Sequence, residues 1–169
     1  IPHHEQAVLM SDIALTNSSS EEILSLAQEI KAAQVPEIEQ MKGWKGVSAS
    51  MHMGHMMDGM LSENEIDQLA KSSGIEFDLL FLAGMIGHHE GALTMVSMLD
   101  TTKNGEAKQL AENIRVSQTA EIAAMKKLLE EIKLTRKAIE NMKINMTINA
   151  PKIDASHEVW KAKNTNWNK

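Results

Sequence analysis

Cysteine is absent from this chain of 169 residues, which excludes disulfide bonds and thiolate metal sites. Aromatic residues are scarce, at 3% with no tyrosine, so aliphatic and methionine side chains must fill the core. No uninterrupted apolar run reaches the roughly 18 residues that a membrane span needs, and no signal peptide is in view. Basic residues are scattered and the formal net charge is -6, which argues against nucleic acid as a partner. We expect a single domain with neither a membrane span nor nucleic-acid binding.

Methionine is the residue that the chain has in excess, with 13 copies. A thioether cannot form a disulfide, and it needs no deprotonation to bind a metal. A chain without cysteine that is rich in methionine and histidine is therefore suited to soft metal ions in an oxidising compartment. We expect a bacterial protein that is periplasmic or secreted.

A pattern of ten residues occurs twice, as IPHHEQAVLM at 1–10 and as IGHHEGALTM at 86–95. The similarity continues downstream, where LAQEIKAAQVPEIEQMK from Leu26 matches LAENIRVSQTAEIAAMK from Leu110. A colinear match of this length, with a repeated histidine pair, indicates an internal duplication. The first copy begins at Ile1 without the residues that lead into the second copy, so we expect a mature or trimmed chain in which the first copy is incomplete.

Each copy has the pattern of a helical hairpin. At about 100° per residue, the positions from Leu110 to Met125 that both copies share fall within one sector of roughly 120°, which is typical of the buried stripe of a bundle helix. Two hairpins predict an all-α fold, with an antiparallel four-helix bundle as the simplest arrangement. We predict a bundle at 1–140, composed of unit one at 1–43, a methionine-rich crossover at 44–62 and unit two at 63–140, followed by an irregular tail at 141–169.

One helix face in each copy carries residues that bind metals. In the second copy, paired histidines share a face with methionines one or two turns away, and a methionine of the partner helix could complete a site. Buried histidine and methionine are also ordinary core residues, which is the alternative for any one of them. Their repeated combination favours a metal site. The candidate ligands are His88, His89, Met85, Met95, Met98 and Met125 in the second copy, and His3, His4, Met10 and Met41 in the first.

Residues 51–60, MHMGHMMDGM, carry five methionines, two histidines and two glycines. A core helix cannot use so many flexible side chains beside glycine, and a solvated loop gains nothing by exposing them. Thioethers and imidazoles together suit Cu(I), and Ag(I) by the same softness, whereas Asp58 as the one hard ligand weighs against Ca²⁺ or Mg²⁺. A methionine-rich surface for a partner protein is the alternative. The candidate ligands here are His52, Met53, His55, Met56, Met57 and Met60.

The segment EFDLLFLAGMIGHHEGALTMV at 76–96 resembles the bacterial family known as domain of unknown function 305, whose signature is FD-x-x-FL-x-x-MI-x-HH-x-GA-x-x-M. The resemblance covers roughly residues 1 to 130. It implies a ferritin-like four-helix bundle, export to the periplasm and a role in copper handling. Two positions depart from the pattern, because Gln6 replaces the glycine of the second copy and Ile66 stands where relatives often have methionine. The ligands that the resemblance implies are His88, His89, Met95 and Met125, with His3, His4, Met10 and Met41 as their first-copy counterparts.

Sequence motifs of common enzyme classes are missing, among them a Gly-rich phosphate loop, a nucleophile elbow, Glu-x-x-His and His-Glu-x-x-His. We therefore predict a copper-binding protein without catalysis, which sequesters or delivers Cu(I) and contributes to copper resistance and homeostasis. Its partners would be copper ions and a copper sensor or efflux component. Two rival functions remain open, which are a methionine-rich protein-interaction module without metal and a copper-dependent redox enzyme.

Overall fold

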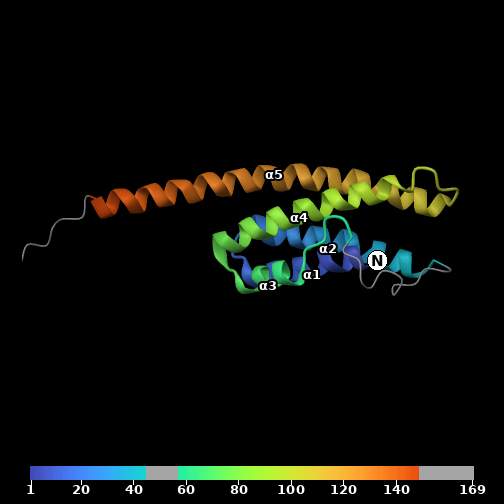
Figure 1. Cartoon of the computed structure of the whole chain (residues 1–169), viewed down its shortest axis with the longest axis horizontal. Helices are drawn as coiled ribbons and strands as arrows, with labels where there is room; N and C mark the ends of the chain where they lie inside the picture. The colour runs from blue at the N-terminus through green and yellow to red at the C-terminus, as the bar shows by residue number, and fades with distance from the viewer. Residues whose placement is uncertain (45–56, 149–169) are drawn as a thin grey trace, which may run out of the picture. The chain divides into compact units, whose positions relative to one another are not determined.

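The computed structural model describes residues 1–44 and 57–148, and its regular structure in these ranges is entirely α-helical. The all-α prediction is confirmed for this part of the chain. The candidate ligands His52, Met53, His55 and Met56 lie outside the described residues, as does 149–169 of the predicted tail. The helices, coloured along the chain in Figure 1, are α1 (Pro2–Asn17), α2 (Glu21–Lys42), α3 (Glu63–Lys71), α4 (Gly74–Ser97) and α5 (Gly105–Ile148).

Polar side chains explain where two of the helices begin. Ser62 and Glu65 form a capping box before α3, in which the serine hydroxyl accepts from the Glu65 amide and the carboxylate accepts from the Ser62 amide. Before α5, the side-chain oxygen of Asn104 accepts hydrogen bonds of 3.0 and 3.1 Å from two amides of the first turn. Capping side chains therefore define the first residues of α3 and α5.

The long helices are arranged as two antiparallel hairpins. In the first hairpin, α1 and α2 are joined by ion pairs from His4 to Glu37 and from Asp12 to Lys31. A residue early in α1 thus contacts one near the end of α2, and a residue later in α1 contacts one in the middle of α2. The two helices therefore run antiparallel. The corresponding contacts between α4 and α5 are the ion pair of His89 with Glu121 and the hydrogen bond of Arg115 to the Val96 carbonyl.

The two hairpins meet where α1 packs against α4. The imidazole Nε2 of His88 lies 2.8 Å from the backbone carbonyl oxygen of His3, and α3 contacts both α1 and α4. The chain divides into a compact unit from Ile1 to Leu134 and a second unit from Thr135 onward. All five helices contribute to the first unit, and only the last part of α5 belongs to the second.

Aliphatic and methionine side chains fill the main core, as the scarcity of aromatic residues predicts. Phe77 and Phe81 stack at a centroid separation of 5.8 Å, and Met10, Met85 and Met125 are fully buried in the same cluster. A smaller cluster joins the end of α4 to the start of α5, and Met41 and Trp44 pack against it. The core residues Val96, Leu110, Ala111 and Ile114 make up this smaller cluster.

The predicted irregular tail from residue 141 is wrong in its first eight residues, because α5 continues to Ile148. Lack of a clear apolar period suggested a loop there, yet residues 141–148 contain neither proline nor glycine, and Asn and Lys can be accommodated in an exposed helix. Pro151 is the first proline after the start of α5. The boundary of the first compact unit at Leu134 also precedes the predicted end of the bundle at 140.

Among the described helices, α4 is the one that is long and apolar enough to cross a membrane. Half of its apolar window is buried inside the fold, and its buried residues include Asp78, His88 and His89. The core helix of a folded protein passes the same test of length and composition. Burial of its apolar surface by neighbouring helices gives α4 the role of a central core element.

The segment at 57–61, which we call the strap, enters α3 after crossing close to α4. Gly59 has φ of 80°, and a Cβ atom placed on Gly91 of α4 would lie 2.0 Å from the Asp58 carbonyl oxygen. On the other side, the Gln6 side chain of α1 exchanges two hydrogen bonds with the backbone of Leu61, of 2.9 and 2.7 Å. Gln6 and Gly91 occupy matching positions of the repeated decamer. Gln6 binds the strap through hydrogen bonds, and Gly91 lets the strap backbone pack closely against α4.

Replacing Gly91 with alanine should lower the free energy of unfolding by about 1–3 kcal/mol, because the added methyl group overlaps the strap backbone. Gly87→Ala is the matched control, since a Cβ there meets no atom within 4 Å. The control should be neutral or up to about 1 kcal/mol more stable, as alanine favours helix. Urea unfolding of both variants measures the difference, and equal stability would contradict the close packing of the strap.

Candidate metal centre

Four buried imidazoles gather where α1 meets α4. His3 and His4 lie in the first turn of α1, and His88 and His89 lie in the middle of α4. Their exposed fractions are 3%, 6%, 0% and 0% in that order. The rings of His3 and His88 approach to a centroid distance of 3.7 Å with an interplanar angle of 33°. The two histidine pairs of the repeat, which are 85 residues apart in sequence, therefore converge in the fold.

Backbone hydrogen bonds fix the tautomer of the two central rings. His88 Nε2 lies 2.8 Å from the His3 carbonyl oxygen, and His3 Nε2 lies 3.1 Å from the Asp58 carbonyl oxygen of the strap. A carbonyl oxygen only accepts, so each ring must donate through an Nε2–H group. In the neutral imidazole the lone pair then resides on Nδ1, which is a nitrogen that can bind a metal.

The two outer rings are each paired with a carboxylate. His89 Nε2 lies 2.6 Å from Glu121 Oε2, and His4 Nε2 lies 2.8 Å from Glu37 Oε2. These pairs occupy matching positions in the two copies of the repeat. A carboxylate that accepts from one ring nitrogen orients the imidazole and increases the basicity of the other nitrogen, as around many metal-bound histidines. The sequence analysis did not assign the glutamates, although the repeated QxxE spacing before each methionine was a usable signal.

Within residues 1–44 and 57–148, three imidazole nitrogens are buried without a hydrogen-bond partner, namely the Nδ1 atoms of His3, His88 and His89. A buried polar atom without a partner costs free energy, so such atoms call for an explanation. Gln34 and Gln118, a second matched pair of the repeat, also have buried side-chain amides with neither the nitrogen nor the oxygen paired. The repeated positions thus carry a set of unused polar groups inside the helical fold.

Burial keeps the central histidines neutral. Desolvation, reinforced by repulsion from His3 and His89, lowers the pKa of His88 to about 2. Desolvation also lowers the pKa of His3 to about 4, with repulsion from His4 as a lesser cause. Metals bind the neutral form of imidazole, so both rings are in the ligating form at neutral pH.

The predicted methionine ligands are distributed unequally. Met10, Met85 and Met125 are fully buried in one cluster, and a Cβ on Gly84 would lie 3.3 Å from the terminal methyl of Met10. Met98 is 73% exposed and does not share this environment. The half-buried candidates are Met41, whose sulfur is 3.9 Å from the Ile1 nitrogen, Met95, Met57 and Met60.

Within 1–44 and 57–148, no three side chains among histidine, aspartate and glutamate converge to hold a metal ion. A centre with three or more ligands in this part of the protein would take donors of another type beside imidazole, and the buried thioethers of the same core are candidates. Such a mixed ligand set suits soft monovalent ions rather than Mg²⁺ or Ca²⁺.

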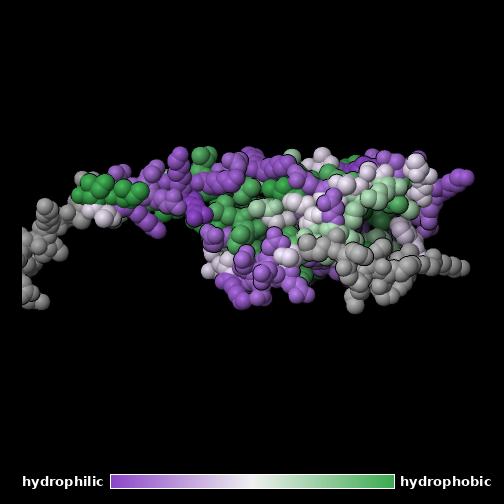
Figure 2. All heavy atoms as spheres, in the orientation of Figure 1, coloured by the Kyte–Doolittle hydropathy of each residue, from purple (hydrophilic) through white to green (hydrophobic). Residues whose placement is uncertain are grey.

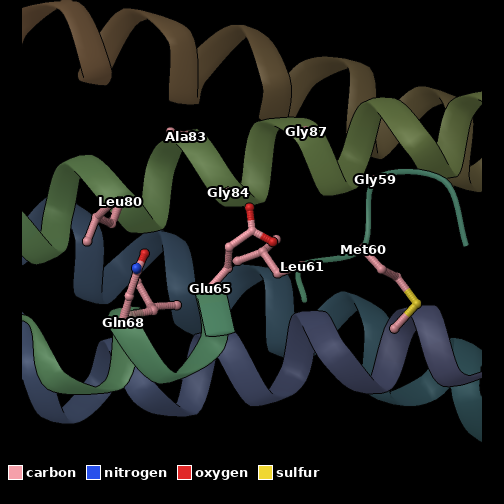
Figure 3. Close-up of a pocket in the computed structure, with 10 residues that line it drawn as sticks. Gly59, Met60, Leu61, Glu65, Gln68, Leu80, Ala83, Gly84 and Gly87 are labelled. Atoms are coloured by element: carbon pink, nitrogen blue, oxygen red, sulfur yellow. The ribbon is translucent and has the colours of Figure 1, made fainter. Parts of the chain in front are cut away.

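A hollow of about 390 Å³ lies between the strap, α3 and α4, as Figure 3 shows. Its lining includes Met60, Leu61 and Leu69 together with the small residues Gly84 and Gly87. Among the lining residues in the described part of the chain there is no histidine, and Met60 is the one predicted ligand. The hollow is therefore separate from the histidine cluster.

The metal-free protein should lose stability as the pH falls below about 6.5, because the unfolded chain binds protons there while His3 and His88 in the folded state do not until about pH 4 and 2. Each ring adds a slope of up to about 1.4 kcal/mol per pH unit. Denaturant unfolding between about pH 7 and pH 5 measures this slope. Replacing His88 with glutamine should reduce it, and an unchanged slope in this variant would contradict a neutral buried ring.

Comparisons with known proteins agree with this architecture. The family model of DUF305, domain of unknown function 305, matches residues 1–129. A DUF305 protein of Streptomyces coelicolor, described as secreted, is 32% identical with a TM-score of 0.71, over 78% of this chain and 88% of its own. CopM in the Cu(I)-bound form is 34% identical with a TM-score of 0.65, over 77% of this chain and 89% of its own. CopM also has Cu(II)-bound and Ag-bound structures.

An uncharacterized protein of Acanthamoeba polyphaga mimivirus is 44% identical over 61 residues. This match covers 36% of the chain and only 40% of the viral protein, so it spans well under half of that relative. The family model, in contrast, spans most of the chain and includes both histidine pairs, the strap and the three buried core methionines. The chain belongs to the DUF305 family.

Proposed function

We propose that the protein binds Cu(I), with Ag(I) as a surrogate, through imidazole Nδ1 atoms and thioether sulfurs of its core. The observation that carries this proposal is the set of three buried Nδ1 atoms, on His3, His88 and His89, that have no hydrogen-bond partner. Neutral imidazole and thioether are both ligands that soft metal ions accept without proton release. A bound ion would supply the partner that these atoms lack.

The register of the second hairpin supports methionine sulfur as the other donor at this site. Met85 lies three and four residues before the histidines of α4, so it shares their helix face. On α5, Met125 lies one turn beyond Glu121, whose carboxylate contacts His89. Because α4 and α5 run antiparallel, the turns that carry Met85 and Met125 face each other beside the His89 layer. We propose this layer as the principal copper site, with Met10 as a further sulfur donor.

The comparison with CopM supports the choice of metal. CopM structures contain Cu(I), Cu(II) and Ag, and this chain is 34% identical to the Cu(I)-bound form. The preference for Cu(I) follows from the donor set proposed here, since thioethers stabilise the softer monovalent ion. The methionine-rich residues 51–60, which overlap the strap in sequence, would add a second set of thioether and imidazole donors.

We further propose that the role is sequestration or delivery of copper without catalysis, in the periplasm or outside a bacterial cell. Burial of the imidazoles supports storage or transfer over turnover, because a substrate cannot reach rings that are 0–6% exposed. A family member described as secreted supports the location. A copper sensor or efflux component would receive the ion, and copper resistance would follow from lowering free Cu(I).

The overall arrangement that we propose is a ferritin-like antiparallel four-helix bundle formed by a duplicated hairpin. The matched ion pairs His4–Glu37 and His89–Glu121 support the duplication, because corresponding residues make corresponding contacts. The antiparallel course of both hairpins and the contact of α1 with α4 support the bundle. In this arrangement an approximate two-fold axis passes between the rings of His3 and His88.

Cu(I) and Ag(I) titrations of the full chain, followed by native mass spectrometry and isothermal calorimetry, test the core site. Met85→Leu with Met125→Leu should weaken binding at least tenfold or remove one ion, because leucine keeps the volume and removes the sulfur. Met98→Leu is the control, since its exposed side chain should leave binding unchanged. A chain without residues 51–60 separates the contribution of that segment. Absence of Cu(I) binding tighter than micromolar would contradict the proposal.

Replacing Glu121 with glutamine should weaken Ag(I) binding by about 10–100-fold, because the amide no longer fixes the tautomer of His89 or increases its basicity. Glu112→Gln on the same helix is the matched control, since Glu112 is exposed and pairs with Arg115 at 3.3 Å. Circular dichroism checks that both variants fold. Equal affinity in the two variants would show that Glu121 does not act on the ligand.

A further inference from the structure

The end of α5 differs in charge from the residues before it. Seven of the 17 lysine and arginine residues, but only three of the 23 acidic residues, follow Leu134. An acidic compact unit is thus followed by a basic one. The DUF305 match ends at residue 129, so this basic extension lies beyond the part that the family model describes.

Large apolar side chains of this extension are exposed to solvent. Among the described residues, seven large apolar side chains are more than half exposed, and five of these lie at or after Leu134 with exposed fractions of 57–74%. Figure 2 shows apolar side chains gathered at the end of α5. A cluster of exposed apolar side chains marks a surface that binds another protein or a membrane. The five are Leu134, Met142, Ile144, Met146 and Ile148.

One side of the extension is apolar and free of charge. At about 100° per residue, Leu134, Ile139, Met142 and Met146 fall within an arc of about 140°, whereas Ile144 and Ile148 lie outside it, next to charged positions. The charged residues of 135–148 all lie outside this arc, and one of them, Arg136, pairs with Glu140 at 3.2 Å. Three of the four charges are positive, so the polar face is basic. These charged residues are Arg136, Lys137, Glu140 and Lys143.

We propose that residues 134–148 form an interfacial helix that binds the surface of a membrane containing anionic lipid. The apolar arc would enter the boundary between headgroups and acyl chains, while lysine and arginine side chains attract the anionic headgroups. A second copy of the chain fits this surface less well. If two extensions packed through their apolar arcs, the positive charges beside the arcs would lie close together and repel each other. The binding needs no metal, so it is independent of the copper site.

Sedimentation of the metal-free full chain with lipid vesicles tests this assignment. Vesicles of phosphatidylcholine with phosphatidylglycerol should bind the protein at least tenfold more tightly than phosphatidylcholine alone, and high salt should remove the difference. Met142→Asp with Met146→Asp should lower binding to the anionic vesicles at least tenfold. Val116→Asp is the matched control, since Val116 is 66% exposed on the same helix within the first unit and should leave binding unchanged.

A triple variant, Arg136→Gln with Lys137→Gln and Lys143→Gln, should weaken binding to anionic vesicles and leave the weak binding to phosphatidylcholine unchanged. Absence of binding to anionic vesicles, or an equal loss in Val116→Asp, would overturn the proposal. Light scattering provides the other decisive readout. If the protein is a dimer that Met142→Asp with Met146→Asp converts to monomers, a second copy covers this face and the membrane assignment is wrong.

Discussion

The contact between the rings of His3 and His88 is the point on which both the packing and the chemistry depend. Each ring uses its Nε2–H on a backbone carbonyl, His88 on that of His3 and His3 on that of Asp58. The first hydrogen bond links α4 to α1, and the second links α1 to the strap. Because they occupy only the Nε2 atoms, both Nδ1 atoms remain unpaired within the core.

The two copies of the repeat differ where they contact the strap. The chain has one strap, so α1 and α4 meet it in different ways. Gly91 allows the Asp58 backbone to approach α4 more closely than any side chain would permit. Gln6, at the equivalent place on α1, instead binds the Leu61 backbone through both ends of its amide. The glutamine that departs from the family pattern thus has a structural reason. Two nearly equal helices hold one asymmetric connection by different means.

Much of the helical fold could be predicted from sequence because its signals are local. The apolar period and the repeat are sufficient to predict the two hairpins. The end of α5 was not predicted, because its apolar residues lie on more than one side of the helix and give only a weak period. Sequence spacing placed the histidines and core methionines on suitable faces, but it could not show that Met98 points to solvent.

The hydrogen-bond partners of the imidazoles lay beyond sequence reasoning for a different reason. The contact of His3 with the Asp58 carbonyl joins residues 55 positions apart through backbone atoms that carry no side-chain signal. The glutamates that meet His4 and His89 come from partner helices, and only the antiparallel register identifies them. Repeated spacing predicted which residues belong together, and tertiary contact determined which nitrogen of each ring stays available.

The unpaired Nδ1 atoms have a consequence for the lifetime of the protein. In the proposed copper-bound form these nitrogens would gain a partner, so occupancy and resistance to unfolding would rise together. Proteases that act on transiently opened chains would then remove the empty form faster than the loaded form. The amount of the protein would then rise with the copper supply, without any change in its rate of synthesis.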